Sequence, residues 1–308
     1  MINRILIRIK VVQMMYSYLL SSNNMSKAEA KANLQKSLEK GYELYNYLLL
    51  LMVQLTELQE DRLIQAKNKY LPTEEDLHPN LKLVNNLFVK TLKNNRTFQD
   101  YLNENPMTWV DDDIFMKLML DRILKSDLYA EYLEVEGNNY EEDCQFWHSV
   151  MKDIILKDDD LSETLEAKSV YWNDDLLTVG SFVLKTIKLF EQKSEEPILP
   201  MFRNLDDSQF GNNLLSYAIA DMDKNNEIID SYLKPEQWDK DRVAIMDRLI
   251  MSVALSEVLH FPSIPARVTL NEYIEIAKFY STPKSGQFIN GILNSAINHM
   301  RDTKMINK

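Results

Sequence analysis

The sequence has few of the residues from which other fold classes are built. Its single cysteine, Cys144, excludes an internal disulfide framework and any site made of several cysteines, and it fits a reducing cytoplasm. With only 6 glycines and 9 prolines in 308 residues, the chain also lacks the turn residues that β-hairpins need. The longest apolar run, from Tyr47 to Val53, is too short to cross a bilayer, so we expect no membrane partner.

The motifs of catalysis are missing as well. None of the four histidines stands in a His-Glu-x-x-His spacing, and the chain has no glycine-rich phosphate loop, nucleophile elbow or dinucleotide fingerprint. The aspartate runs at 111–113 and 158–160 lack the glycine and the bidentate glutamate of a calcium loop, and each is typical of a helix start. We therefore expect no catalytic residue, no metal site and no cofactor.

Charge is distributed unevenly along the chain. The net charge of −12 by itself argues against a nucleic-acid partner. However, residues 1–28 hold four Lys/Arg and no acid, residues 262–308 hold six Lys/Arg and three Asp/Glu, and residues 29–261 carry −19. Either the two basic ends meet in the fold and form an anion-binding surface, or the distribution is a chance fluctuation of surface charge.

Apolar residues recur every three or four positions along almost the whole chain, which predicts an all-α fold. The first helix is expected over residues 3–21. Its buried face should consist of Ile5, Ile9, Val12, Tyr16 and Leu19. A second helix should begin at a capping box of Ser26 and Glu29 and continue, with a break near Gly41, to about residue 70. Further helices are expected at about 79–103, 111–134, 140–157, 174–193 and 211–231.

Three helices are expected in the last third of the chain. The first covers about 239–260, and the second begins at a capping box of Thr269 and Glu272. The third begins at Ser281-Thr282-Pro283, a hydroxyl cap followed by proline in the first helical position. This helix contains Gly291, and because glycine in mid-helix costs about 1 kcal/mol relative to alanine, we expect Gly291 to permit close helix packing.

These same helices carry motifs of a known family. The stretch 241–259 is followed by Ile264-Pro265, by Asn-Glu-x-x-Glu-x-Ala-Lys at 271–278, and by Ser-x-x-Phe-Ile-Asn-Gly-Ile-Leu at 285–293. Near the N-terminus, residues 8–21 hold Arg, Val-Gln, Tyr-Ser and Leu in one predicted helix. A less specific segment of the same kind begins at Asp175. In this order and spacing, the segments resemble the NusB family of transcription-antitermination factors.

The resemblance implies a NusB-like helical bundle with an additional helical insertion. It covers residues 1–22 and 171–302, which we expect to form one discontinuous domain. Residues 23–170 have no counterpart in the compact form of the family. We expect this acidic segment to be a helical insertion or an enlarged front half of the domain.

The resemblance also implies a function. NusB-type proteins bind the boxA segment of nascent RNA together with NusE, a small ribosomal-subunit protein, and help the RNA polymerase elongation complex resist termination in ribosomal RNA operons. We therefore expect a cytoplasmic bacterial protein with these partners and no enzymatic activity. The alternative is a NusB-fold interaction scaffold whose acidic insertion binds partners and which does not bind RNA.

Single-stranded RNA is recognised by cations, aromatic faces and hydrogen-bonding side chains. Arg4 and Arg8 lie one turn apart on the first helix and are candidate phosphate contacts, the alternative being a solvated helix face. Gln13 matches a family position and is a further candidate. If the two basic ends form one surface, Arg8 and Lys284 should lie on the same face, within about 16 Å of each other.

The start of the last helix is the stronger candidate, because free N–H groups and the helix dipole attract anions there. Lys284, Ser285 and Gln287 add a cation and two hydrogen-bonding side chains, and Gly286 leaves room for an approaching backbone.

Two aromatic residues near this helix start have two interpretations each. Phe288 is either a stacking surface for RNA or a core residue, and Tyr280 either stacks on a base or packs at the helix junction. On the preceding helix, Asn271, Glu272 and Glu275 are candidate contacts for the protein partner, although a helix cap and a solvated face also explain the two glutamates.

Overall fold

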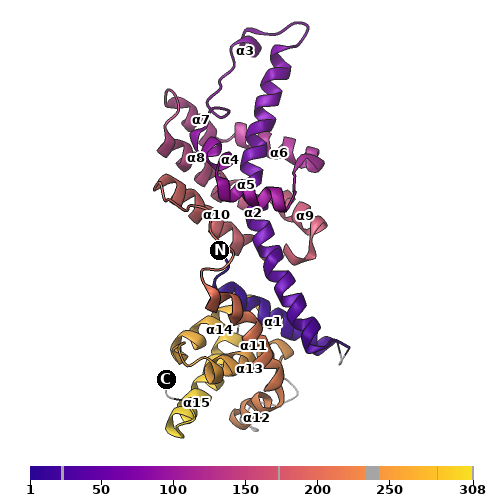
Figure 1. Cartoon of the computed structure of the whole chain (residues 1–308), viewed down its shortest axis with the longest axis vertical. Helices are drawn as coiled ribbons and strands as arrows, with labels where there is room; N and C mark the ends of the chain where they lie inside the picture. The colour runs from indigo at the N-terminus through magenta and orange to yellow at the C-terminus, as the bar shows by residue number, and fades with distance from the viewer. Residues whose placement is uncertain (22–23, 173, 234–242, 283, 307–308) are drawn as a thin grey trace. The chain divides into compact units, whose positions relative to one another are not determined.

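The computed structural model describes residues 1–21, 24–172, 174–233, 243–282 and 284–306 (Figure 1). Within these ranges it has fifteen α-helices, three short 3-10 helices and no β-strand, so the predicted all-α fold is confirmed. None of the described helices is both long enough and apolar enough to span a membrane. Backbone contacts divide the chain into unit 1, residues 1 and 39–201, and unit 2, residues 2–38 and 202–308.

Unit 2 is built from both ends of the chain. Its helices are α1 (Arg4–Leu20), the first part of α2 (Lys27–Lys67), α11 (Leu205–Ala220), α12 (Met222–Tyr232), α13 (Ile245–His260), α14 (Ala266–Tyr280) and α15 (Ser285–Asp302). α13 packs against each of α1, α11, α12, α14 and α15 (Figure 1). Every residue from 249 to 258 is buried, so α13 is the centre of this bundle.

Unit 1 contains the rest of α2 and the segment up to residue 201. Its other elements are α3 (Glu74–Leu77), α4 (Leu87–Lys93), α5 (Arg96–Glu104), η1 (Val110–Asp112), α6 (Asp113–Leu124), α7 (Asp127–Glu134), α8 (Tyr140–Asp153), η2 (Ile155–Lys157), α9 (Asp159–Lys168), η3 (Val170–Trp172) and α10 (Leu176–Glu191). The helix predicted over 211–231 is divided at Asp221 into α11 and α12, and two helices of unit 1 that were predicted as continuous are interrupted too. The side chains of Asn95 and Ser126 cap new helices there, α5 and α7, each by accepting a backbone N–H.

The two units divide the chain at other positions than those expected from the sequence. Residues 24–38 belong to unit 2, and the described residues of 171–201 belong to unit 1. The physical reason for the second difference is packing, because α10 lies against α8, and both helices are in unit 1. The two units are defined by backbone contacts and not by similarity to a family. The expected extent of the family-like domain, 1–22 and 171–302, stays a prediction.

The buried face of α1 is not the predicted one. Ile5, Tyr16 and Leu19 are exposed. The helix instead buries Leu6, Ile7, Arg8, Lys10, Val11, Val12 and Met15. Apolar residues occupy almost every angular position of this helix, so their spacing does not define one face. The partners of its charged residues, described below, decide which side turns inward.

Some predicted helix starts are confirmed and others are wrong. The N–H of Ser26 donates to Glu29 and the N–H of Glu29 donates to the Ser26 hydroxyl, at 2.6 and 3.2 Å, so the capping box of α2 is confirmed. α2 continues past Gly41 without the expected break. Asp158 caps α9 as predicted, by accepting the N–H of Leu161 at 3.1 Å. By contrast, Asp112 makes no side-chain cap at the start of α6.

The predicted starts of the last two helices are wrong. α14 begins at Ala266, so Thr269 lies inside the helix and is buried. α15 begins at Ser285, with Lys284 at its N-cap, instead of at the Ser281 hydroxyl cap. The proline predicted for its first position, Pro283, lies outside the described residues, as do the first four residues of the helix expected at 239–260.

Candidate nucleic-acid interface

A buried carboxylate fixes the turn between α14 and α15. Asp247 of α13 accepts hydrogen bonds from the hydroxyl groups of Ser281 and Ser285, the latter at 2.9 Å. The Ser285 hydroxyl in turn accepts the backbone N–H of Thr282 at 3.2 Å. Ser285 is only 2% exposed, so it holds the start of α15 in place. This corrects the expectation that its side chain contacts RNA.

The first turn of α15 presents other groups to solvent. Lys284 and Gln287 are exposed, and no side chain of the described residues makes a capping hydrogen bond to the N–H groups at this end of the helix. Phe288 is half-buried. Gly286 is buried, and a Cβ there would lie 3.7 Å from the Ile274 side chain of α14. Gly286 therefore faces the neighbouring helix and not an approaching ligand.

Gly291 does not have the packing role that we predicted. It is exposed, and a Cβ built on it would have no described neighbour within 4 Å. Close approach of α14 and α15 occurs at Gly286, one and a half turns earlier.

The first helix reaches this junction through a side-chain hydrogen bond. The amide nitrogen of Gln13 donates to the Tyr280 hydroxyl at 3.3 Å, and both residues are half-buried. Two residues at opposite ends of the sequence are thus brought together next to the start of α15. We call Gln13, Tyr280, Lys284 and Gln287 the junction surface. It combines a cation, an aromatic ring and amide groups, which are the components that single-stranded RNA requires.

Arg8, by contrast, is inside the unit. Its guanidinium donates to both carboxylate oxygens of Glu257 at 2.7 and 2.8 Å, and it is 3% exposed. The hydroxyl groups of Thr269 and Tyr273 donate to the same carboxylate, at 2.8 and 3.1 Å. Burial lowers the pKa of Arg8, but the hydrogen bonds and charge of Glu257 outweigh it and hold that pKa above its ordinary value.

The structure therefore corrects the expected role of Arg8 in phosphate binding. Two of its five N–H donors are taken by Glu257, and at 3% exposure the others cannot reach a phosphate in solvent. The predicted common face of Arg8 and Lys284 fails for the same reason, because Arg8 has no exposed face. The pairing also explains the orientation of α1, since Arg8 must turn inward to meet Glu257.

The remaining cations of α1 are also drawn into the unit. The Nε of Arg4 donates to Asp207 at 2.8 Å, and its guanidinium lies 5.0 Å from the centre of the Phe210 ring. The Arg4 side chain is 31% exposed. Lys10 is buried. The count of four positive charges in residues 1–28 thus overstates the charge that this helix presents to a ligand.

One face of α14 is open to solvent. Asn271, Glu275 and Phe279 are four residues apart and all exposed, and we call them the α14 outer face. Phe279 is 80% exposed, although large aromatic side chains are usually covered. Glu275 accepts a hydrogen bond from Lys278. Glu272 is half-buried and lies 3.8 Å from Arg8, so it belongs in part to the interior.

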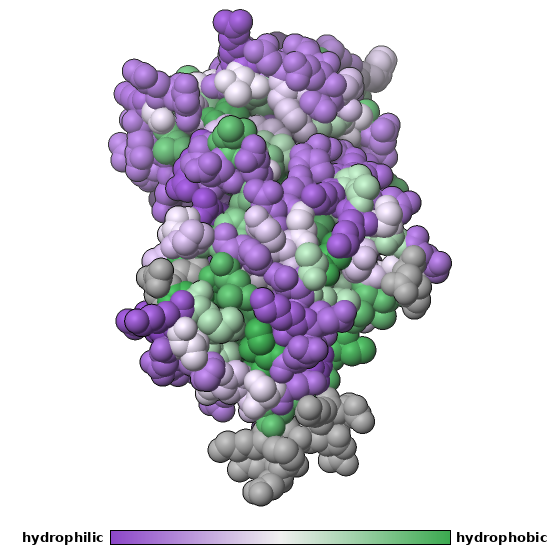
Figure 2. All heavy atoms as spheres, turned by 60° about the horizontal axis from the view of Figure 1, so that its bottom comes forward, coloured by the Kyte–Doolittle hydropathy of each residue, from purple (hydrophilic) through white to green (hydrophobic). Residues whose placement is uncertain are grey.

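Sequence reasoning missed Phe279. Its exposure follows from the helical spacing in α14. The buried face of this helix includes Tyr273, Ile276 and Ala277, which leaves Phe279 on the opposite side together with Glu275. Exposed apolar side chains are common in this protein, and Figure 2 shows them as green patches among purple polar residues on the face turned to the viewer. In the described part of the chain, no group of His, Cys, Asp or Glu is arranged to hold a metal ion.

Comparison with known proteins identifies relatives of the C-terminal part of the chain. The model of the NusB family matches residues 183–298. The transcription antitermination protein NusB of Salinibacter ruber is 33% identical over 110 residues, which cover 36% of this chain and 68% of that protein. The protein of the same name from Bacillus cereus is 35% identical over 102 residues, covering 32% of this chain and 78% of the relative. No solved structure matches. The family match does not extend to residues 1–22, whose resemblance to the family stays a prediction.

Proposed function

Because the chain belongs to the NusB family, we propose that it is a transcription-antitermination factor that acts by binding and not by catalysis. Its proposed ligand is boxA-type single-stranded RNA in the bacterial cytoplasm. It binds that RNA together with a NusE-type small ribosomal-subunit protein, as part of an RNA polymerase elongation complex.

The observation that carries this proposal is the junction surface. Lys284 supplies the cation at an uncapped helix N-terminus, where phosphate is favoured. The Tyr280 ring, held by Gln13, offers a stacking face, and Gln287 offers an amide for a base edge or a phosphate. The surface lies in unit 2, which has 18 Lys/Arg and 15 Asp/Glu. Its net charge is therefore +3, and a positive net charge does not repel RNA.

The protein partner is assigned to the α14 outer face. An exposed aromatic side chain is a typical anchor of a protein interface, and Phe279 has that exposure. Asn271 and Glu275 precede it on the same face and add an amide and a carboxylate, the latter paired with Lys278, that can accept hydrogen bonds from a partner. In this arrangement the RNA lies at the C-terminal end of α14, next to Phe279, and the protein partner lies along the exposed face of the same helix.

Titration of labelled boxA-type RNA at two salt concentrations tests the RNA assignment. Lys284→Ala should weaken binding by up to about tenfold and reduce the salt slope by about one, because one counterion fewer is released. The matched control is Lys224→Ala, which removes an exposed lysine of α12 in the same unit and should leave affinity unchanged. Equal behaviour of the two variants would show that the junction surface does not bind RNA.

Titration with the NusE-type protein tests the other surface. Phe279→Ala should weaken that binding by about tenfold or more, as expected for an aromatic anchor, while binding of RNA alone is kept. Leu205→Ala is the control, because Leu205 is also exposed but lies at the start of α11. If both variants bind the partner as tightly as the wild type, the α14 outer face has no part in the contact.

A protein-interaction scaffold without RNA affinity is the second candidate, and the burial of Arg8 favours it. Both N-terminal arginines that the sequence offers to RNA are paired within unit 2. This candidate predicts that the wild-type protein binds the NusE-type partner but shows no saturable RNA binding at low salt, with or without that partner.

A further inference from the structure

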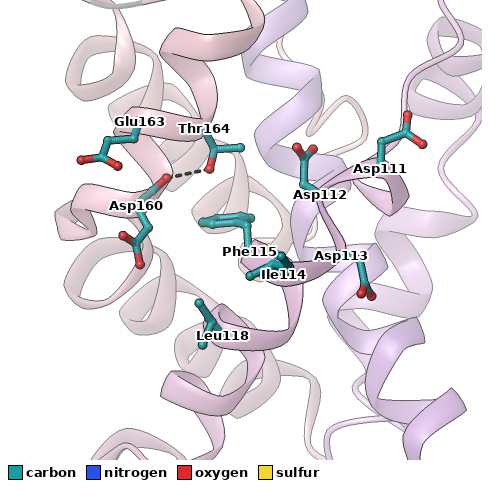
Figure 3. A pocket seen from close by; sticks show the side chains of 9 residues that line it. All are labelled: Asp111, Asp112, Asp113, Ile114, Phe115, Leu118, Asp160, Glu163 and Thr164. Atoms are coloured by element: carbon teal, nitrogen blue, oxygen red, sulfur yellow. Dashed lines mark hydrogen bonds between the residues drawn. The ribbon is translucent and has the colours of Figure 1, made fainter.

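A hollow in unit 1 has the composition of a peptide-binding site. It has a volume of about 600 Å³ and lies between η1 and α6 on one side and α9 on the other (Figure 3). Nine residues line it, and they are Asp111, Asp112, Asp113, Ile114, Phe115, Leu118, Asp160, Glu163 and Thr164. Five of the nine are acidic, and the lining has no Lys, Arg or His. We call this site the α6–α9 hollow.

Its floor is apolar and uncovered by any described residue of the chain. Ile114 and Leu118 are one turn apart on α6 and are 76% and 47% exposed, and Val110, one turn before them, is 71% exposed. In Figure 3 the side chains of Ile114, Phe115 and Leu118 lie between the two groups of carboxylates. An exposed apolar row of this kind, rimmed by polar residues, marks a binding surface more often than a solvated helix face.

The floor is also rigid. Phe115 is buried and stacks at 5.3 Å on Trp109, which stacks at 4.0 Å on Tyr47. The Trp109 indole N–H donates to the backbone carbonyl of Tyr47 at 2.9 Å. Two ion pairs join the walls, one between Lys168 and Asp112 at 2.8 Å and one between Arg122 and Asp160. A preformed site loses less conformational entropy when it binds a ligand.

The charges that remain specify the occupant. Asp112, Asp113 and Asp160 are paired with Lys168, Lys117 and Arg122. Among the residues that the structure describes, Asp111 and Glu163 have no ion-pair partner, and Figure 3 shows them on opposite sides of the hollow.

We propose that the α6–α9 hollow binds a basic segment of a partner protein, placing an aliphatic side chain on Ile114 and Leu118 and cations against Asp111 and Glu163. Unit 1 has 17 Lys/Arg and 32 Asp/Glu, a net charge of −15, which attracts such a segment and repels RNA. The site is separate from the junction surface, since all its residues belong to unit 1.

The test uses the full chain and a short fluorescent peptide in which lysines flank a single leucine. The double variant Ile114→Ser/Leu118→Ser should weaken peptide binding by about tenfold, because it removes the apolar contact from an exposed position where the fold does not depend on it. The variant Asp111→Asn/Glu163→Gln should weaken it by about threefold to tenfold and reduce its salt dependence. Replacing the leucine of the peptide by serine should weaken binding as much as the double variant Ile114→Ser/Leu118→Ser does.

Matched controls separate the site from general attraction. Glu74→Gln/Glu75→Gln removes two exposed carboxylates of unit 1 on α3, and Leu177→Ser removes an exposed leucine of α10. Both should bind the peptide like the wild type. The proposal is overturned if the α3 variant weakens binding as much as the variant of Asp111 and Glu163, because net charge alone then explains the attraction.

Two other occupants would also overturn the proposal. If Mg²⁺ or Ca²⁺ binds saturably and displaces the peptide, the hollow is a cation site. If the protein self-associates in sedimentation and the variant of Ile114 and Leu118 is monomeric, the hollow is covered by a second copy of the chain.

Discussion

Unit 1 and unit 2 are both helical, but they use charge in opposite ways. Unit 1 carries −15 and leaves many carboxylates at its surface, whereas unit 2 carries +3 and buries two of the three cations of α1, Arg8 and Lys10. The centre of unit 1 near η1 is a stack of Tyr47, Trp109 and Phe115, while that of unit 2 contains the ion pair of Arg8 and Glu257. The net charge of a region therefore does not say which of its charges a ligand can reach.

This difference matters for the search for binding sites. In unit 2, counting cations directs attention to α1, but the cation exposed at the junction surface is Lys284. In unit 1, acidic residues are too many for their number to indicate a site, but among the five that line the α6–α9 hollow, pairing singles out Asp111 and Glu163. In both units, the residues that remain after internal pairing are the candidates for function.

The largest expected effect tests whether unit 2 depends on its buried charge pair. Arg8→Ala should lower the free energy of unfolding by about 3–5 kcal/mol, because it leaves the carboxylate of Glu257 buried without its cation. Urea denaturation followed by circular dichroism measures this, and hydrogen exchange of α1 and α13 should rise with it. The double variant Arg8→Met/Glu257→Leu should recover most of the loss, and a double variant as unstable as Arg8→Ala would contradict the charge explanation.

A smaller effect is expected where α1 meets α11. A Cβ on Gly211 would lie 2.9 Å from Cγ2 of Ile7, whose branched side chain has little freedom to rotate away. Gly211→Ala should therefore destabilise the protein by about 1–3 kcal/mol through overpacking. A melting temperature equal to that of the wild type would mean that α1 and α11 separate more easily than this packing implies.

Gly291 is the control for that prediction and should change stability in the opposite direction. It is exposed in mid-helix with open space around it. Gly291→Ala should stabilise the protein by about 0.5–1 kcal/mol, because alanine reduces the conformational entropy of the unfolded chain. Destabilisation in the same denaturation assay would restore the packing role that the sequence suggested.

The smallest effect concerns Cys144 in unit 1, whose thiol we expect not to react in the folded protein. Burial, together with the charges of Glu191 and Asp143, raises the pKa of the Cys144 thiol to about 12. Since the thiolate is the reactive form, Cys144 should not react with a thiol reagent at pH 8 in the folded protein and should react fully in denaturant. Fast labelling of the folded protein would show that the packing of α8 and α10 opens readily.

Several features of the fold follow from local chemistry and were predictable. The all-α class follows from spacing, and the caps at Ser26 and Asp158 follow from side chains that bond to the next turn of their own helix. The wrong predictions at Thr269 and Ser285 share one cause, which is that the partners of these hydroxyl groups are distant in sequence. The Thr269 hydroxyl meets Glu257 and the Ser285 hydroxyl meets Asp247, so neither acts as the local motif suggested.

By itself, the sequence determined that the chain is helical, that its C-terminal part carries NusB motifs, and that a helix begins close to Lys284. Tertiary structure alone decided that Arg8 is buried, that Gln13 meets Tyr280, and that Ile114 and Leu118 share a hollow with Glu163. The physical reason is that helix formation and capping involve neighbours within about one turn. Burial of a charge, in contrast, depends on finding its partner, and the partner of Arg8 is 249 residues away in the chain.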